Sequence, residues 1–198
     1  MEGRRSVSDP MSESSASESI PAPDSIPAGP PTGEVAMLVD VQSRLANPAT
    51  ITIARGMSHF GEHAAGWVAL SAIGALLSRT RRRDWLLVGV GAVAAHAAAI
   101  VIKLAVRRRR PHHPDININV STPSALSFPS AHATSSTAAA MLLCRATRSP
   151  LPLVAVPLMA LSRLVLGVHY PTDVLAGMTV GAAVAGATGR LGGRRSER

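Results

Sequence analysis

The chain has 198 residues and a formal net charge of +8, and 46% of its residues are hydrophobic but only 3% aromatic. A disulfide-stapled fold is excluded because Cys144 is the single cysteine, and a nucleic-acid binder is disfavoured because two Trp, two Phe and one Tyr leave few rings to stack on bases. The abundance of Ala, Val, Leu and Gly is instead typical of a membrane protein.

The amino-terminal part of the chain is polar. Residues 1–34 are rich in Ser, Pro, Ala and Glu, and they carry too little apolar surface to offset the entropy lost on ordering. We therefore expect a disordered acidic tail. In residues 35–47 apolar positions alternate with Asp, Gln and Arg, which predicts a short helix lying in the membrane interface. This helix is too polar to span a bilayer.

Five apolar segments follow, and together they predict an all-α fold, a polytopic membrane helix bundle occupying residues 35–198. Each segment is close to the roughly 17 to 25 residues that cross the hydrocarbon core. A soluble helical bundle is the alternative, but a soluble helix keeps a polar face, whereas residues 85–102 offer only His96. The expected transmembrane segments are 61–78, 84–106, 127–144, 151–167 and 173–189.

Basic residues are unevenly distributed among the connecting loops. Ten of the twenty lie in three clusters that five crossings place on one face: 79–83, 145–150 and the tail from 190. Arginine-rich loops tend to stay in the cytoplasm. The opposite face, which we expect outside the plasma membrane, receives 107–126 with its arginine run and the region 163–173. Five crossings also place the acidic amino-terminal tail outside, so the reverse orientation stays an alternative.

Three polar motifs fall on that opposite face, at residues 103–111, 129–132 and 162–173. They bring together three permanent cations, two histidines, a hydroxyl and one carboxylate, which is the inventory of a metal-free phosphoryl transfer. Guanidinium groups match the geometry of phosphoryl oxygens, while the only lysine of the chain offers a point charge. The side chains concerned are Lys103, Arg110, Ser130, His132, Arg163, His169 and Asp173.

The two histidines are expected to have different tasks. His169 can attack phosphorus as a neutral imidazole if its other nitrogen donates to Asp173, which lies four residues further on. His132 can then protonate the departing alkoxide. The stretch "SFPSAH" predicts a helix start with Ser127 as the cap and Pro129 in the first turn, so free backbone N–H groups would face the phosphate.

These motifs resemble the three signature motifs of the type 2 phosphatidic acid phosphatase superfamily over residues 60–189. The resemblance implies that His169 forms a phosphohistidine, Asp173 orients it and His132 is the acid. It also implies that the phosphoryl oxygens are held by Lys103, Arg110, Ser130 and Arg163, without metal or cofactor. Ala131 stands where the family usually has glycine; its N–H is retained, but its Cβ narrows the approach of phosphate.

Two groups of neighbouring residues are candidates for headgroup contacts. Arg107, Arg108 and Arg109 are expected to contact either the lipid headgroups of the bilayer or the polar part of the substrate. His63, which lies at the start of the first apolar segment with His59 and Glu62, either touches the substrate headgroup or marks the interface.

Three more histidines carry weaker signals. His96 lies in the middle of an apolar segment, where an ionisable group is a functional candidate by default; a neutral imidazole bonded to a neighbouring helix is favoured. His112 and His113, together with Asp115, form a weak metal-binding pattern, and no metal site is predicted.

The sequence therefore predicts a membrane enzyme that hydrolyses a lipid phosphomonoester, with the bilayer and the lipid phosphate as its partners and no nucleic acid. The segments "GEHAAGW", "RRRRPHHPD", "TPSALSFPSAHATSS" and "LGVHYPTDVLAG" are similar to the actinobacterial branch of the superfamily. That similarity implies a lipid-linked ribose 5-phosphate as the substrate. One alternative is a phosphatase acting on polyprenyl pyrophosphate or phosphatidylglycerophosphate, and another is a basic membrane anchor without catalysis. The oligomeric state stays open.

Overall fold

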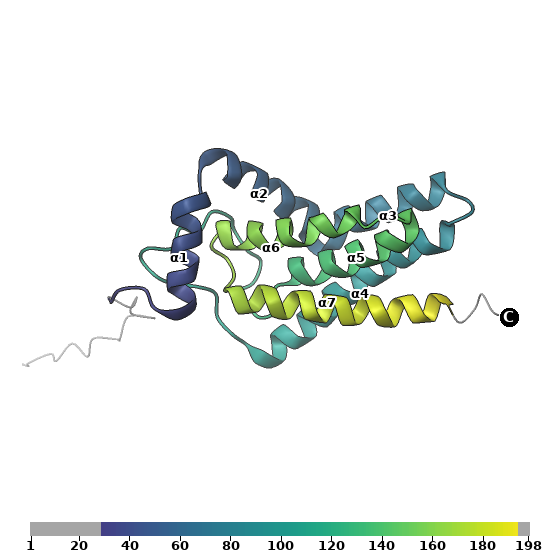
Figure 1. The fold of residues 1–198 in the computed structure, drawn as a ribbon. Coiled ribbons are helices and arrows are strands. Elements are labelled where there is room, and N and C mark those ends of the chain that lie inside the picture. Colours follow the sequence, from purple (N-terminus) through teal and green to yellow (C-terminus); the bar gives the residue numbers. More distant parts are fainter. Residues whose placement is uncertain (1–28, 194–198) are drawn as a thin grey trace, which may run out of the picture.

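The computed structural model describes residues 29–193, so most of the expected disordered tail lies outside the described residues. Within this range the chain forms helices joined by turns and loops, with no strand and one isolated bridge between Arg109 and Leu126. The prediction of an all-α fold is therefore confirmed for the described part. The longer helices run side by side, and the first helix lies across one end of the bundle (Figure 1).

The described residues contain seven α-helices and two short 3₁₀ turns. The α-helices are α1 (Gly33–Leu45), α2 (Pro48–Gly61), α3 (Ala65–Leu77), α4 (Arg82–Val106), α5 (Ala131–Thr147), α6 (Ala155–Val165) and α7 (Pro171–Gly193). The 3₁₀ turns are η1 (Glu62–Ala64), between α2 and α3, and η2 (Leu151–Val154), before α6. A long loop, residues 107–130, joins α4 to α5.

Helix α2 was not expected from the apolar pattern, which placed the first segment at residue 61. The sequence nevertheless contains the residues that start this helix. The Asn47 side chain accepts hydrogen bonds from the N–H groups of Ala49 and Thr50, and Pro48 occupies the first turn, where its missing donor costs nothing. At its end the chain kinks, because His63 and Ala64 both have positive φ, at 49° and 60°.

Three stretches of the described chain are long and apolar enough to cross a membrane. They are Pro48–Leu77, which includes the kink, Arg82–Val106 and Pro171–Leu191. The stretch Leu151–Val165 is apolar but shorter, and α5 has 17 residues. The expected count of five crossings thus stays a prediction, while the presence of membrane-spanning helices is confirmed.

Small residues let the central helices approach each other closely. Ala92, Ala95, Ala138 and Ala139 are fully buried where α4 meets α5. On α7, a Cβ added to Gly181 would lie 2.3 Å from the carbonyl oxygen of Thr134 in α5. This close packing brings the start of α7 against the start of α5, where the backbone N–H of Ser130 donates to the carbonyl of Asp173 at 2.9 Å.

Candidate active site

A cavity of about 450 Å³ lies at the end of the bundle where the loop 107–130 and the α6–α7 connection meet. Six of the residues singled out from the three motifs line it: Lys103, Arg110, Ala131, His132, Arg163 and His169. Residues as distant in the sequence as Lys103 and His169 therefore share one cavity. This convergence agrees with the placement of all three motifs on one face.

His169 lies in the connection between α6 and α7 and is 3% exposed. Its Nε2 is 3.2 Å from Nη1 of Arg110, and its Nδ1 is 3.6 Å from Oδ2 of Asp173. Because a guanidinium can only donate, Nε2 accepts and is unprotonated, which leaves the proton on Nδ1, facing the carboxylate. This tautomer has its lone pair at Nε2, where it accepts from Arg110 and faces the cavity. At 3.6 Å the contact with Asp173 is electrostatic rather than a fully formed hydrogen bond.

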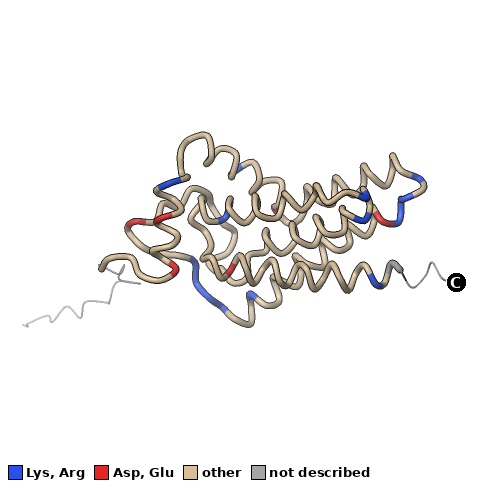
Figure 2. Tube along the Cα trace, viewed as in Figure 1, with Lys and Arg blue, Asp and Glu red and all other residues tan. Residues whose placement is uncertain are grey.

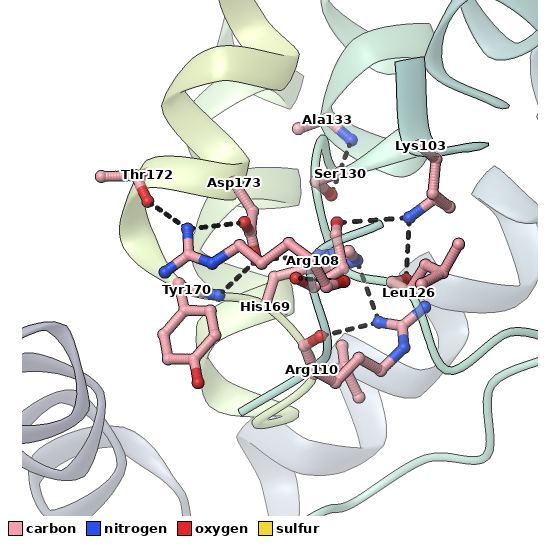
Figure 3. A network of polar contacts seen from close by, with 12 residues as sticks. Lys103, Arg108, Arg110, Leu126, Ser130, Ala133, His169, Tyr170, Thr172 and Asp173 are labelled. Carbon is pink, nitrogen blue, oxygen red and sulfur yellow. Dashed lines mark hydrogen bonds and ion pairs between the residues drawn. The ribbon is translucent and has the colours of Figure 1, made fainter. Parts of the chain in front are cut away.

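Burial lowers the pKa of His169 to about 3, against the opposing effect of Asp173 and with further lowering by Arg110, Lys103 and Arg163. The imidazole is therefore neutral at pH 7, as attack on phosphorus requires. Asp173 itself is fully buried, and its carboxylate accepts from the backbone N–H of Tyr170 at 2.9 Å and from Nη1 of Arg108 at 3.0 Å. Figure 3 shows this network.

Backbone carbonyls hold two of the cations in place. The Nζ of Lys103 donates to the carbonyls of Leu126 and Ser127 at 2.9 and 3.2 Å. Arg110 donates to the carbonyls of Ser124 at 2.8 Å and of Val168 at 2.7 Å. Burial lowers the pKa of Arg110 to about 10, which still leaves its guanidinium charged at neutral pH.

Arg163 is the most deeply buried of the three cations, at 2% exposure. Its Nη1 donates to Oγ of Ser58 at 3.2 Å, whereas Nε and Nη2 are buried with no hydrogen-bond partner among the described residues. Leaving charged donors unpaired is costly. Because this side chain lines the cavity, its two remaining donors can bind the oxygens of an anion, and a phosphoryl group fits that requirement.

Helix α5 begins about one turn later than predicted. Its N-cap is Ser130 rather than Ser127, and Pro129 precedes the cap instead of lying in the first turn. The Oγ of Ser130 accepts from the N–H of Ala133 at 3.4 Å, and this residue is fully buried and does not line the cavity. Ser130 thus caps α5 and lies behind the cavity wall, so its expected contact with the phosphate stays a prediction.

His132 and Ala131 lie in the first turn of α5, which directs the positive end of the helix dipole toward the cavity. The Nε2 of His132 is 3.0 Å from the carbonyl oxygen of Ser58 in α2. A carbonyl only accepts, so Nε2 carries a proton in this arrangement. Ser58, which anchors both His132 and Arg163, was missed by the sequence analysis because it falls in the unexpected helix α2.

The structure separates the remaining candidates into two groups. His59, Glu62, His63 and His96, which come from α2, η1 and α4, line the cavity. The rings of His63 and His96 are 5.7 Å apart, and Nδ1 of His96 is buried without a partner among the described residues, so the expected bond to a neighbouring helix is absent on that nitrogen.

The arginine run next to Arg110 lies outside the cavity wall. Arg107 ends α4 with a positive φ of 55°, and Arg109 takes part in the isolated bridge with Leu126. Arg108 turns away from the cavity toward Asp173, which differs from the headgroup contact expected for it. No group of His, Cys, Asp and Glu in residues 29–193 is arranged to hold a metal, and His113 instead contacts the carbonyl of Gly29.

Comparison with known proteins places these motifs in a family. Residues 84–196 match the family model described as the PAP2 superfamily. A decaprenylphosphoryl-5-phosphoribose phosphatase of Mycobacterium tuberculosis is 58% identical over 166 residues, covering 83% of this chain and 94% of that protein. A protein of the same name from Mycolicibacterium smegmatis is 66% identical over 148 residues, covering 74% and 82%.

A solved structure shares the fold. It is described as the first transmembrane PAP2 type phosphatidylglycerolphosphate phosphatase from Bacillus subtilis, and it matches with a TM-score of 0.63 and 21% identity over 79% of this chain and 84% of that one. At this identity the likeness concerns the arrangement of helices alone.

The lowered pKa of His169 has a direct spectroscopic consequence. A histidine whose pKa lies well below 6.5 stays neutral as the pH falls from 8 to 5, so the ¹⁵N signals of its ring should keep the Nδ1–H tautomer over this range. The measurement is a ¹⁵N-histidine NMR titration of the detergent-purified protein, with His169→Asn used to assign the signal. A ring that becomes doubly protonated near pH 6.5 would contradict the environment described above.

Proposed function

The chain belongs to the PAP2 superfamily, and on that premise we propose that it removes the 5-phosphate of decaprenylphosphoryl-5-phosphoribose, a step in the synthesis of cell-wall arabinan precursors. It is an integral membrane enzyme that hydrolyses phosphoric monoesters. The proposal of this substrate is supported by the mycobacterial relatives of that name, which align with most of the chain.

One observation carries the chemistry: a buried, neutral imidazole with its Nε2 beside Arg110 and its Nδ1 toward Asp173. A phosphoryl group bonded to that Nε2 would lie among Lys103, Arg110 and Arg163, which all line the same cavity. Cations fixed in advance stabilise the charge that spreads over the equatorial oxygens in the transition state. Positioning and electrostatics supply most of the catalysis in phosphoryl transfer, and no metal is required by this donor set.

The first chemical step forms the bond between Nε2 of His169 and phosphorus and breaks the bond between phosphorus and the ribose 5-oxygen. The departing alkoxide takes a proton from the imidazolium form of His132, which is left neutral, and Asp173 stabilises the positive charge that develops on the His169 ring. His132 must exchange its contact with the Ser58 carbonyl for one with the leaving oxygen.

The second step releases phosphate. Water attacks the phosphohistidine, His132 accepts the proton of that water, and the bond between phosphorus and Nε2 breaks, which returns His169 to its neutral form. The acid of the first step is thus the base of the second, as microscopic reversibility requires.

The rest of the cavity suits a polar headgroup joined to an apolar chain. His63, His96 and Glu62 provide donors and acceptors for ribose hydroxyls on the wall formed by η1 and α4. Further along α4 the wall includes Ile100 and Leu104, whose side chains are 43% and 64% exposed on the outside of the bundle. We place the polyprenyl chain along these residues, in the bilayer.

The catalytic end is proposed to face outward from the plasma membrane. Figure 2 shows Lys and Arg gathered at both ends of the bundle. The end remote from the cavity carries the loop residues 79–83 and 145–150, whose arginines favour a cytoplasmic position. Two arginines of the cavity end have a role at the site itself, since Arg108 contacts Asp173 and Arg110 contacts His169.

A panel of lipid phosphates tests the substrate. Purified protein in detergent should release phosphate from decaprenylphosphoryl-5-phosphoribose faster than from a polyprenyl pyrophosphate or phosphatidylglycerophosphate, and EDTA should not inhibit it. Faster release from either competing lipid would contradict the proposed substrate.

The nucleophile is tested by His169→Ala, which should abolish turnover while leaving the protein folded and inserted. Full activity of this variant would exclude His169 as the nucleophile.

The acid role of His132 predicts a dependence on the leaving group. His132→Ala should slow the lipid ribose phosphate by roughly 10²- to 10⁴-fold, the usual contribution of a general acid. An activated aryl phosphate, whose phenolate leaves without help, should lose far less in the phosphoenzyme-forming step. Single-turnover kinetics of that step on both substrates provides the measurement, and equal losses would show that His132 does not donate the proton.

Thiol labelling tests the orientation. In a Cys144→Ser background, a cysteine at Asp115, in the exposed part of the loop 107–130, should react with a membrane-impermeant maleimide in intact cells. A cysteine at Thr80, between α3 and α4 at the opposite end, serves as the matched control and should react only after permeabilisation. The reverse pattern would place the catalytic end in the cytoplasm.

A further inference from the structure

A carboxylate from the first helix reaches the beginning of the last one. Glu34 lies in the first turn of α1, and its Oε1 accepts hydrogen bonds from the backbone N–H of Thr172 at 3.0 Å and from the hydroxyl of Thr172 at 2.6 Å. Thr172 is the second residue of α7, where backbone N–H groups have no partner within the helix. Glu34 therefore caps α7 from another helix, in a position that the helix dipole favours.

The second oxygen of Glu34 binds Arg108. Its Oε2 lies 2.6 Å from Nη2 of Arg108, while Nη1 of the same guanidinium donates to Oδ1 of Asp173 at 3.0 Å and to the hydroxyl of Thr172 at 2.7 Å. The guanidinium also stacks 4.1 Å above the ring of Tyr170. Arg108 thus lies between two carboxylates, on the side of Asp173 away from His169 (Figure 3).

We propose that Glu34 and Arg108 are positioning residues for the reaction: Glu34 orients Arg108, and Arg108 fixes the Asp173 carboxylate against His169. The proposal rests on the proposed function, since it concerns how that same nucleophile is held. It adds Arg108, a residue of the first motif that does not line the cavity, and Glu34, which lies outside all three motifs. Glu34 also lies outside the matched family region, residues 84–196.

The geometry of Asp173 explains why this support is needed. One carboxylate oxygen, Oδ2, accepts from the Tyr170 backbone and faces Nδ1 of His169. If the other oxygen had no partner, the carboxylate could rotate, and the tautomer of His169 would no longer be set. The Arg108 contact to Oδ1 blocks that rotation. A fully buried carboxylate also requires a charged partner to be stable, and Arg108 supplies it.

Negative, positive and negative side chains follow one another in the row Glu34, Arg108 and Asp173. Alone, the Arg108 cation would draw the negative charge of Asp173 away from His169, and Glu34 offsets this by neutralising Arg108 from the far side. Burial raises the pKa of Glu34, but its bonds with Thr172 and Arg108 outweigh this and lower the pKa overall. Glu34 is therefore ionised at neutral pH and able to pair with Arg108.

The test compares Arg108→Gln and Glu34→Gln with two control variants on the same first helix. Asp40→Asn and Arg44→Gln break an exposed ion pair of similar length, at 2.9 Å, that does not reach the site. The probe is p-nitrophenyl phosphate, which makes the assay independent of the lipid. Both test variants should lower kcat roughly 10- to 100-fold, as displacement of a catalytic group does, while the controls stay within about twofold.

Three further readouts separate positioning from general damage to the fold. The KM and the inhibition constant of vanadate should change less than about threefold, because Lys103, Arg110 and Arg163 are untouched. The Nδ1–H proton signal of His169 should broaden or disappear in both test variants, since its acceptor is no longer fixed. The charge-conserving Arg108→Lys should recover part of kcat and of the signal.

The outcomes are decisive in each direction. An unchanged kcat with an unchanged Nδ1–H signal overturns the proposal, and so does a parallel loss of kcat, vanadate binding and thermal stability, which marks a structural role only. If Arg108→Gln does not fold, Glu34→Gln decides by the same criteria, because it removes no group that contacts Asp173 directly. A wild-type protein that hydrolyses neither the probe nor any lipid phosphate refutes the proposed function instead.

Discussion

The site depends on concentrating positive charge around a neutral histidine in a buried cavity. Arg163 is almost wholly buried with two donors unsatisfied by the described residues, and Arg110 lies against the Nε2 of His169. Such an arrangement is unfavourable in a protein interior unless an anion offsets it. The same excess of cations favours a phosphoryl dianion. Burial lowers the pKa of His169 and these cations lower it further, so the proposed nucleophile is uncharged at neutral pH.

The helix packing serves to bring distant motifs to one end of the bundle. Glycine at position 181 allows α7 to contact the backbone of α5, and the N–H of Ser130 then meets the carbonyl of Asp173. The loop 107–130 folds over this junction and holds Lys103 and Arg110 by its backbone carbonyls. Each cation is therefore fixed by the chain rather than by a carboxylate, which keeps its charge available to the substrate.

The first helix has a larger part in the site than an interfacial anchor would. Glu34 links α1 to the start of α7 and, through Arg108, to Asp173. A residue near the amino-terminal end of the described chain thus contacts the support of the nucleophile. Because α1 lies across the end of the bundle, this link joins it to the carboxylate beside His169 (Figure 1).

The sequence by itself determined the helical class, the three motifs and their convergence on one face. These follow from local properties: apolar length, the alternation of crossings, and the spacing of four residues that lets His169 and Asp173 meet. Only the folded chain shows which hydroxyl caps α5, that Ser58 anchors His132 and Arg163, and that Arg108 contacts Asp173. The last two depend on contacts between residues at least 65 positions apart in the sequence, and no local pattern records the direction of those side chains.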